Sequence, residues 1–247
     1  MEERLARIVI GAIQGRSGKT TFTIGLLRAM KNQGYKVQPF KKGPDYIDPS
    51  WATMASGVQS RNLDMFMTTE EKIRESLMAH SHGAHLAVIE GAMGLFDGFD
   101  VQGSNSTAEL AYITKSPVIL VVNGQRITRS VAAIVQGVVH FNPRITIGGV
   151  ILNQVARARH ENIMRSAIEY YTDVQVLGAL PKAKEVEIPD RHLGLIPAGE
   201  RVALQNRIDK LGQLVTDHVD LKALMEVAST AQALEVKEEK PIIVKTK

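Results

Sequence analysis

Short apolar runs alternate with longer segments of helical period between residues 7 and 180 of this chain. The apolar runs are rich in Val and Ile, which is typical of buried strands, and the segments between them are amphipathic. The predicted strands cover residues 7–12, 36–41, 86–90, 117–123, 145–152 and 175–180. The predicted helices cover residues 19–33, 69–81, 106–114, 126–141 and 157–171. This alternation predicts a three-layer α/β fold, in which a mostly parallel sheet carries helices on both faces.

Three segments are too long to be plain connections. They cover residues 42–64, 91–105 and 182–198, and each is rich in Gly, Pro, Asp or Arg and follows a predicted strand. Ligands of such sheets bind outside the carboxyl ends of the strands, so these segments are expected to carry the functional residues. A polar helical stretch then completes a single predicted domain over residues 1–234, and residues 235–247 are expected to form a linker or a frayed end.

Composition narrows the classes of function. With 247 residues, 44% of them apolar and 23% charged, the chain has the make-up of a soluble globular protein. The net charge is only +4 and the cations are dispersed, so no nucleic-acid surface is expected. The absence of Cys excludes disulfides, Cys-based zinc sites and a cysteine nucleophile from this sequence. No apolar stretch is long enough for a membrane span, and a cytoplasmic protein without membrane partners is expected.

The strongest motif is a phosphate-binding loop between the first strand and the first helix. It comprises Gly15, Arg16, Ser17, Gly18, Lys19, Thr20 and Thr21. Backbone amides at such a helix start point toward an anion, Lys19 is expected to reach the outer phosphates of ATP, and Thr20 to bind Mg²⁺. The alternative is a glycine turn with Lys19 in solvent. Ile13 occupies the place of the usual first Gly, and the spacing instead resembles the variant loops of the dethiobiotin synthetase and MinD/ParA class.

Carboxylates follow the next two strands. Asp45 and Asp48 lie in a proline-stiffened loop and are predicted to bind metal or to orient a nucleophile, with a simple turn as the alternative. Glu90 ends an apolar strand in the Walker B position, and a buried Glu needs a nearby cation. Asp97, in the glycine-rich segment that follows, is a further catalytic candidate. Asn153 is predicted either to pair with adenine or to form a helix cap or an Asx turn.

Several ordered motifs together resemble the cobyrinic acid a,c-diamide synthase family over about residues 7–200. The motifs are Gly18-Lys19-Thr20-Thr21, Gln38 to Lys41 with Gly43 to Pro49, Ser60 to Asp64, Glu90-Gly91 with Met93 to Gly98, Thr128 to Ser130, Gly149 to Asn153, and Arg191 to Leu195. The resemblance implies a P-loop NTPase fold similar to dethiobiotin synthetase and a two-part ligase of cobalamin biosynthesis. In such an enzyme a synthetase domain phosphorylates acetate carboxylates of the corrin, and a glutaminase domain supplies ammonia. The chain stops before a glutaminase domain, so a fused domain or a separate subunit is the expected partner.

The resemblance also implies roles for single residues. Mg²⁺ is assigned to Thr20, Glu90 and one or both of Asp45 and Asp48. The polycarboxylate tetrapyrrole is expected to meet cationic and aromatic side chains. These candidates are Lys41, Lys42, Tyr46, Arg61, Arg129, Arg191 and His192. The chain departs from the family at Arg16-Ser17, where Gly-Val is usual, and at Asn123, where an Asp commonly ends the strand.

Rival interpretations remain open at this stage. Cobyrinic acid, hydrogenobyrinic acid, nickel-sirohydrochlorin and sirohaem all carry acetates that this chemistry would amidate. A MinD/ParA-like switch would instead hydrolyse ATP to control dimerisation. Gln14 stands where the partition ATPases carry a signature Lys, and no membrane-binding amphipathic tail is evident, which argues against the switch. A homodimer is left open.

Overall fold

The computed structural model describes residues 2–3, 5–182 and 198–235 of the chain. Its main sheet has seven parallel strands in the order β4-β3-β5-β2-β6-β7-β8. The strands are β2 (Arg7–Ala12), β3 (Val37–Lys42), β4 (Arg61–Leu63), β5 (Leu86–Glu90), β6 (Val118–Asn123), β7 (Ile147–Val155) and β8 (Val176–Pro181). A separate antiparallel pair joins β1 (Glu2–Glu3) to β9 (Leu234–Glu235). The predicted parallel α/β fold is therefore confirmed.

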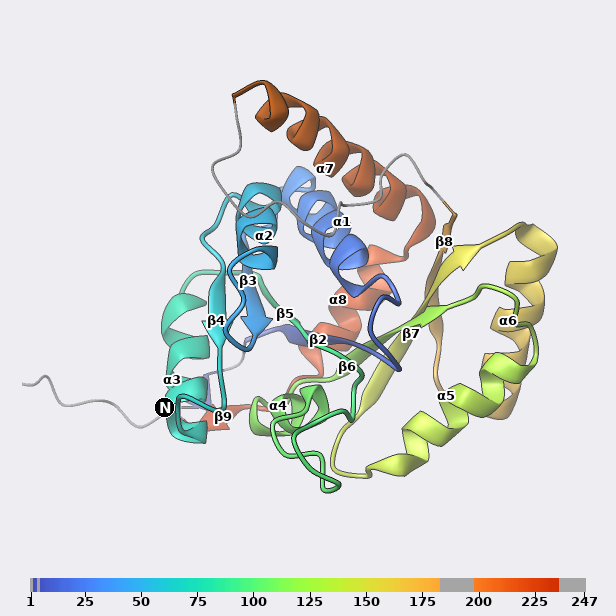
Figure 1. Ribbon diagram of the computed structural model, residues 1–247, viewed down its shortest axis with the longest axis horizontal. Coiled ribbons are helices and arrows are strands. Elements are labelled where there is room, and N and C mark those ends of the chain that lie inside the picture. The colour runs from blue at the N-terminus through green and yellow to red at the C-terminus, as the bar shows by residue number, and fades with distance from the viewer. Residues whose placement is uncertain (1, 4, 183–197, 236–247) are drawn as a thin grey trace, which may run out of the picture.

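Helices cover both faces of the sheet (Figure 1). One face packs against α1 (Lys19–Asn32), α2 (Asp48–Ser56), α7 (Ala198–His218) and α8 (Leu221–Ser229). The other packs against α3 (Glu70–His80), α4 (Thr107–Ile113), α5 (Ser130–Phe141) and α6 (Ala158–Tyr171). Successive residues of a strand point to opposite faces, so Ile8 and Ile10 belong to the α1 side of the core and Val9 to the α4 side. The continuous apolar strands follow from this burial on both faces.

Two elements lie inside a segment that the sequence pattern treated as a connection. Helix α2 and strand β4 both fall within residues 42–64. Strand β4 is only three residues long and lies at the sheet edge, which is too short for an alternating pattern to be recognised. Helix α2 has Pro49 in its first turn and buries Trp51, Ala52 and Ala55, so its apolar face is small. Short elements of this kind are recognised only from their tertiary packing.

The helical stretch predicted for the C-terminal part is confirmed, with a break that the sequence pattern did not indicate. The stretch after Gly199 forms two helices, and α8 begins where the Asp220 side chain accepts a hydrogen bond from the Ala223 amide. Glu235, the first residue of the predicted tail, is paired in β9, and residues 236–247 lie outside the described residues. Most of the predicted functional segment 182–198 also lies outside them. Among the residues that are described, no helix has the length and apolar character needed to cross a bilayer.

Candidate active site

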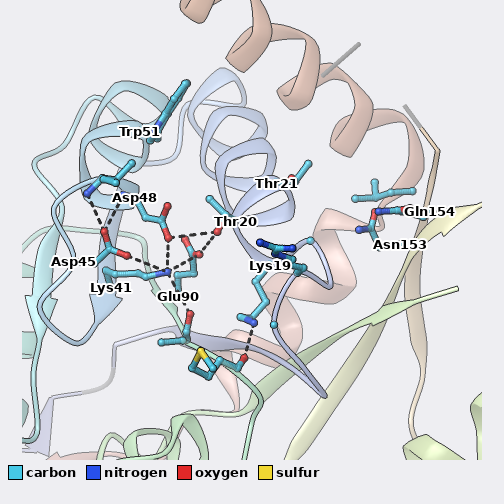
Figure 2. A pocket seen from close by; sticks show the side chains of 18 of the residues that line it. Lys19, Thr20, Thr21, Lys41, Asp45, Asp48, Trp51, Glu90, Asn153 and Gln154 are labelled. Carbon is cyan, nitrogen blue, oxygen red and sulfur yellow. Dashed lines mark hydrogen bonds and ion pairs between the residues drawn. The ribbon is translucent and has the colours of Figure 1, made fainter. Parts of the chain in front are cut away.

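A cavity of about 1100 Å³ opens at the carboxyl ends of the central strands. Its walls come from the β2–α1, β3–α2 and β5–α4 loops, from the ends of β7 and β8, and from α7. Figure 2 shows Lys41, Asp45, Asp48 and Glu90 on one side of the start of α1, and Asn153 and Gln154 on the other. The volume is comparable with that of sites that enclose small-molecule ligands. The cavity therefore joins the predicted phosphate loop to the predicted acidic loops.

The phosphate loop is held by a residue from a distant strand. Nδ2 of Asn153, at the end of β7, donates a 2.9 Å hydrogen bond to the Ser17 carbonyl. Gly18 caps α1 with a φ of 97°, a left-handed conformation that favours glycine. A Cβ atom at Gly18 would overlap the amide nitrogen of Asn153. Loop and strand therefore pack closely, and the Asn153 amide supports the loop. This contact differs from the predicted roles of Asn153, which were to pair with adenine or to form a helix cap or an Asx turn.

Lys19 is buried within this loop. Its Nζ donates to the Met93 carbonyl at 2.6 Å and approaches the Gln14 carbonyl at 3.5 Å. Burial lowers the pKa of Lys19, and the negative charges of Glu90 and Asp48 partly oppose that change. No carboxylate forms an ion pair with Lys19 in the described part of the chain. Among the described residues its ammonium therefore contacts only neutral carbonyl groups, and its charge is available for a phosphate.

Lys41 is the centre of the acidic side of the cavity. Its Nζ lies 2.6 Å from Asp48 Oδ2, 2.8 Å from Glu90 Oε1 and 3.9 Å from Asp45 Oδ2. Burial by itself would lower the pKa of Lys41, but the charges of Glu90 and Asp48 outweigh it and raise the pKa. Burial raises the pKa of Glu90, and the Lys41 ammonium opposes that rise. The cation that a buried Glu90 requires is thus Lys41.

Oxygen atoms next to Lys41 form a set that fits Mg²⁺. Thr20 Oγ1 lies 2.5 Å from Glu90 Oε1 and 3.5 Å from Asp48 Oδ2. Hydroxyl and carboxylate oxygens are the hard donors that Mg²⁺ prefers, and this ion commonly keeps waters and phosphate oxygens as its other ligands. Among the described residues, no three or more His, Cys, Asp or Glu side chains form a group that could hold a metal by themselves. The donor set therefore suits an ion that arrives with a nucleotide.

Asp45 and Asp97 both stabilise their own loops. Oδ1 of Asp45 accepts hydrogen bonds from the amides of Ile47 at 2.8 Å and Asp48 at 3.2 Å, which is an Asx-type turn. Its other oxygen is the one that approaches Lys41. Oδ2 of Asp97 accepts from the Gly94 amide at 2.9 Å, and Asp97 is not among the cavity-lining residues. Asp48 and Glu90 are therefore the carboxylates closest to the Thr20 hydroxyl.

The remaining substrate candidates are spread over several places. Lys42, at the end of β3, is half-buried, and burial lowers its pKa. Arg61 is exposed on β4, and Tyr46 is 84% exposed on the β3–α2 loop. Arg129, at the start of α5, donates to the Tyr171 hydroxyl and does not line the cavity. Arg191 and His192 lie outside the described residues.

Met93, Trp51 and Gln154 are among the cavity-lining residues that were not predicted from the sequence. Met93 contributes the carbonyl that holds Lys19, and a backbone group carries no residue-specific signal. Trp51, the only Trp of the chain, is buried in α2 and could have been noticed because it follows the Asp48-Pro49 pair closely. Gln154 adopts a positive φ of 59° directly after Asn153, which no sequence feature indicates.

The chain is similar to known proteins over most of its length. The family model described as "CobQ/CobB/MinD/ParA nucleotide binding domain" matches residues 8–196. The chain is 44% identical over 243 residues to a cobyrinate a,c-diamide synthase of Magnetococcus marinus, covering 98% of this chain and 52% of that protein. It is 44% identical over 230 residues to a hydrogenobyrinate a,c-diamide synthase of Streptomyces coelicolor, covering 92% and 47%. The chain thus spans about half the length of the curated relatives it matches.

Solved structures with a related fold have low sequence identity. Chloroplast FtsY from Physcomitrella patens superimposes with a TM-score of 0.51 at 14% identity, covering 92% of this chain and 66% of that one. At this identity the likeness concerns the fold alone.

Proposed function

This chain belongs to the CobQ/CobB/MinD/ParA nucleotide-binding domain family, and from that membership we propose that it is the ATP-dependent synthetase part of a tetrapyrrole amidoligase. The proposed substrates are the a and c acetate carboxylates of cobyrinic acid or of its metal-free counterpart, hydrogenobyrinic acid. Support comes from relatives whose names include both compounds, at 44% identity over more than nine tenths of this chain. In this proposal the chain activates carboxylates for amide formation.

A single observation carries the proposal. Lys19 and Thr20 of the phosphate loop lie beside the cluster of Lys41, Asp48 and Glu90 in one cavity. The loop amides and Lys19 would bind the outer phosphates of ATP. Thr20, Glu90 and Asp48 would hold Mg²⁺, whose charge neutralises the phosphate oxygens. A nucleotide and a metal site side by side are what phosphoryl transfer requires.

The proposed reaction has two steps. A carboxylate oxygen of the substrate attacks the γ-phosphorus of ATP, and the bond to the β,γ-bridging oxygen breaks, which releases ADP and forms an acyl phosphate. Ammonia then attacks the acyl carbon, phosphate leaves, and one proton of the ammonia ends on the phosphate. A carboxylate is a poor electrophile until its oxygen becomes a leaving group, so the first step is what makes the second feasible. The cycle runs once for each acetate.

The cations of the site have separate parts in this scheme. Lys19, which donates to the carbonyl groups of Met93 and Gln14, would exchange these for oxygens of the transferring phosphate. Lys41 is ion-paired on the acidic side, so it would keep Asp48 and Glu90 in place and reduce their repulsion toward an incoming carboxylate. From the sequence, Lys41 was expected to bind the substrate directly. We propose this indirect role instead, because the donor hydrogens of its ammonium already face carboxylates and the Gly91 carbonyl.

Ammonia must come from elsewhere, since the sequence contains no Cys to act as a glutaminase nucleophile. Because the chain spans about half the length of its curated relatives, a glutaminase domain or subunit is the proposed source. Without a glutaminase, the synthetase part would accept free ammonia from solution.

The test is amidation by this chain with ATP, Mg²⁺ and ammonium chloride, followed by mass spectrometry of cobyrinic acid and hydrogenobyrinic acid. An ATP-dependent loss of about one mass unit for each carboxylate converted would establish the proposed activity. Sirohaem and nickel-sirohydrochlorin serve as comparison substrates. ATP-dependent dimerisation with hydrolysis but no amidation of any of these compounds would contradict the proposal and favour a switch of the MinD/ParA type.

A further inference from the structure

Exposed apolar side chains gather on loops at the carboxyl ends of three neighbouring strands. In the described part of the chain, nine large apolar side chains are at least 64% exposed. Six of the nine lie on the loops that follow β3, β4 and β5: Tyr46, Phe66, Met67, Met93, Phe99 and Val101. These three strands are neighbours in the sheet, in the order β4-β3-β5. A concentration of this kind on a protein surface marks a site of interaction.

Two of the loops meet through an aromatic pair. The rings of Phe66, on the β4–α3 loop, and Phe99, on the β5–α4 loop, have centroids 5.9 Å apart and planes at 86°. The side chains are 77% and 71% exposed, so their mutual contact leaves most of their surface open to solvent. Water contact on so much aromatic surface is unfavourable, and a flat apolar ligand would remove it.

The backbone that carries each ring is held in a hydrogen-bonded turn. The Phe66 amide donates to Asp64 Oδ1 at 2.9 Å, and the Phe99 amide donates to the Ser104 carbonyl at 2.9 Å. Asp100 in turn accepts a hydrogen bond from the Ser104 amide. Ordered turns reduce the conformational entropy that a ligand must overcome when it binds.

Met93, one of these six side chains, lines the cavity of the candidate active site, and cationic side chains lie on the strands that lead into the loops. Strands β3 and β5, which lead into two of the loops, also supply Lys41 and Glu90. Lys42 pairs with Leu63 across β3 and β4 and lies within the electrostatic reach of Asp64, whose side chain holds the Phe66 amide. Arg61 on the same edge is exposed, and its side chain has no hydrogen bond or ion pair among the described residues. Aromatic surface combined with cations suits a ligand with a flat apolar body and carboxylates at its rim.

We infer that Phe66 and Phe99 form the platform on which the macrocycle of the tetrapyrrole substrate rests, so that an acetate at its rim reaches the phosphate-transfer end of the cavity. This inference rests on the proposed function and adds the residues that recognise the body of the substrate. A protein partner would also cover apolar side chains, but Met93 of the same loops lines the cavity that holds Lys41 and Glu90, and this favours the molecule that must react there.

The experiment compares Phe66→Ser, Phe99→Ser and the double variant with the wild-type chain. The matched control is Tyr35→Ser. Tyr35 forms an edge-to-face pair with His85, with ring centroids 5.8 Å apart and planes at 86°, but it lies before the amino end of β3, away from the loops at the carboxyl ends. Equilibrium binding of cobyrinic acid, followed by its visible absorption without ATP, is measured beside the KM for amidation with ammonia. ATP affinity and far-ultraviolet circular dichroism check the nucleotide site and the fold.

Each single variant is expected to weaken corrin binding and to raise the KM about tenfold, with ATP affinity and the control unchanged. Unchanged corrin binding in the double variant, with a wild-type chain that binds and amidates, would overturn the inference alone and leave the proposed function standing. In that case the apolar loops would serve a protein partner. A wild-type chain that neither binds nor amidates any of the tetrapyrroles would remove the proposed function and this inference with it.

Discussion

Nζ of Lys41 lies 2.8 Å from Oε1 of Glu90, and the two residues face each other in register on β3 and β5. Both side chains are almost completely buried. Taking two charges out of water is costly, and their attraction offsets that cost only while both partners are present. The pair therefore fixes the acidic side of the cavity before any ligand binds.

Replacing Lys41 alone should be strongly destabilising. Lys41→Met leaves Glu90 buried without its cation, and we expect the free energy of unfolding to fall by about 3 kcal/mol. Urea denaturation of Lys41→Met, Glu90→Gln and the double variant measures this effect. The double variant should be more stable than the sum of the single changes predicts, because it leaves no unpaired charge on β5. If the losses of unfolding free energy in the two single variants add up to the loss in the double variant, the pair contributes no coupling energy.

Binding of ATP should weaken as the pH rises from about 7 to about 10. Burial lowers the pKa of Lys19 below its usual 10.5, so its ammonium loses its proton at a lower pH than that of a free lysine. A neutral amine no longer attracts phosphate, and the affinity therefore falls with increasing pH. Calorimetric titration at several pH values measures the trend.

Lys19→Arg is the matched control for this pH dependence, because a guanidinium keeps its charge over this range. Its affinity should be lower than that of the wild type but nearly independent of pH. If wild type and variant show the same slope, another group is responsible.

The sequence predicts the local parts of the site better than its distant contacts. The phosphate loop is contiguous between one strand and one helix, so its place in the fold follows from the pattern alone. Lys41 is among the cationic side chains that the resemblance assigns to the polycarboxylate substrate. The alternation of the strand, however, turns Lys41 to the same face as the buried Val37, and the register with β5 brings it to Glu90.

The support of the loop by Asn153 shows the same limit. Its partner, Ser17, is 136 residues away in the sequence, so the contact depends on how β2, β6 and β7 are ordered in the sheet. The need of Glu90 for a cation was predicted from the cost of burying a charge, but the identity of that cation required the structure.

Gly18 and Asn153 should be energetically coupled. Gly18→Ala places a methyl group against the Asn153 amide and forces a left-handed φ on alanine, so we expect a loss of about 1 to 3 kcal/mol in unfolding free energy. Asn153→Ala should cost about 1 kcal/mol through the hydrogen bond to Ser17. The double variant relieves the overlap but keeps the backbone strain, so its loss should be smaller than the sum. Thermal unfolding of the three variants tests this.

Arg7 should anchor the segment of residues 231–235 to the sheet. The buried guanidinium donates to the carbonyls of Leu5, Thr114, Lys115 and Gln232. Arg7→Met leaves these acceptors without a charged donor, and a loss of about 3 kcal/mol is expected. Hydrogen exchange should then accelerate in residues 231–235 more than in α1. Uniform acceleration throughout the sheet would indicate a general loss of stability instead of a local anchor.

Magnesium should strengthen nucleotide binding through the Thr20 hydroxyl. Thr20 Oγ1 and the carboxylates of Glu90 and Asp48 converge beside the phosphate loop, so removal of the hydroxyl leaves one ligand fewer. Thr20→Val should bind ATP like the wild type in EDTA but lose most of the gain that Mg²⁺ provides, about tenfold in affinity. Thr21→Val is the matched control, because Thr21 lines the same cavity and forms no hydrogen bond to these carboxylates. A full magnesium effect in Thr20→Val would assign the ion to other ligands and leave Thr20 as a hydrogen-bond donor to Glu90.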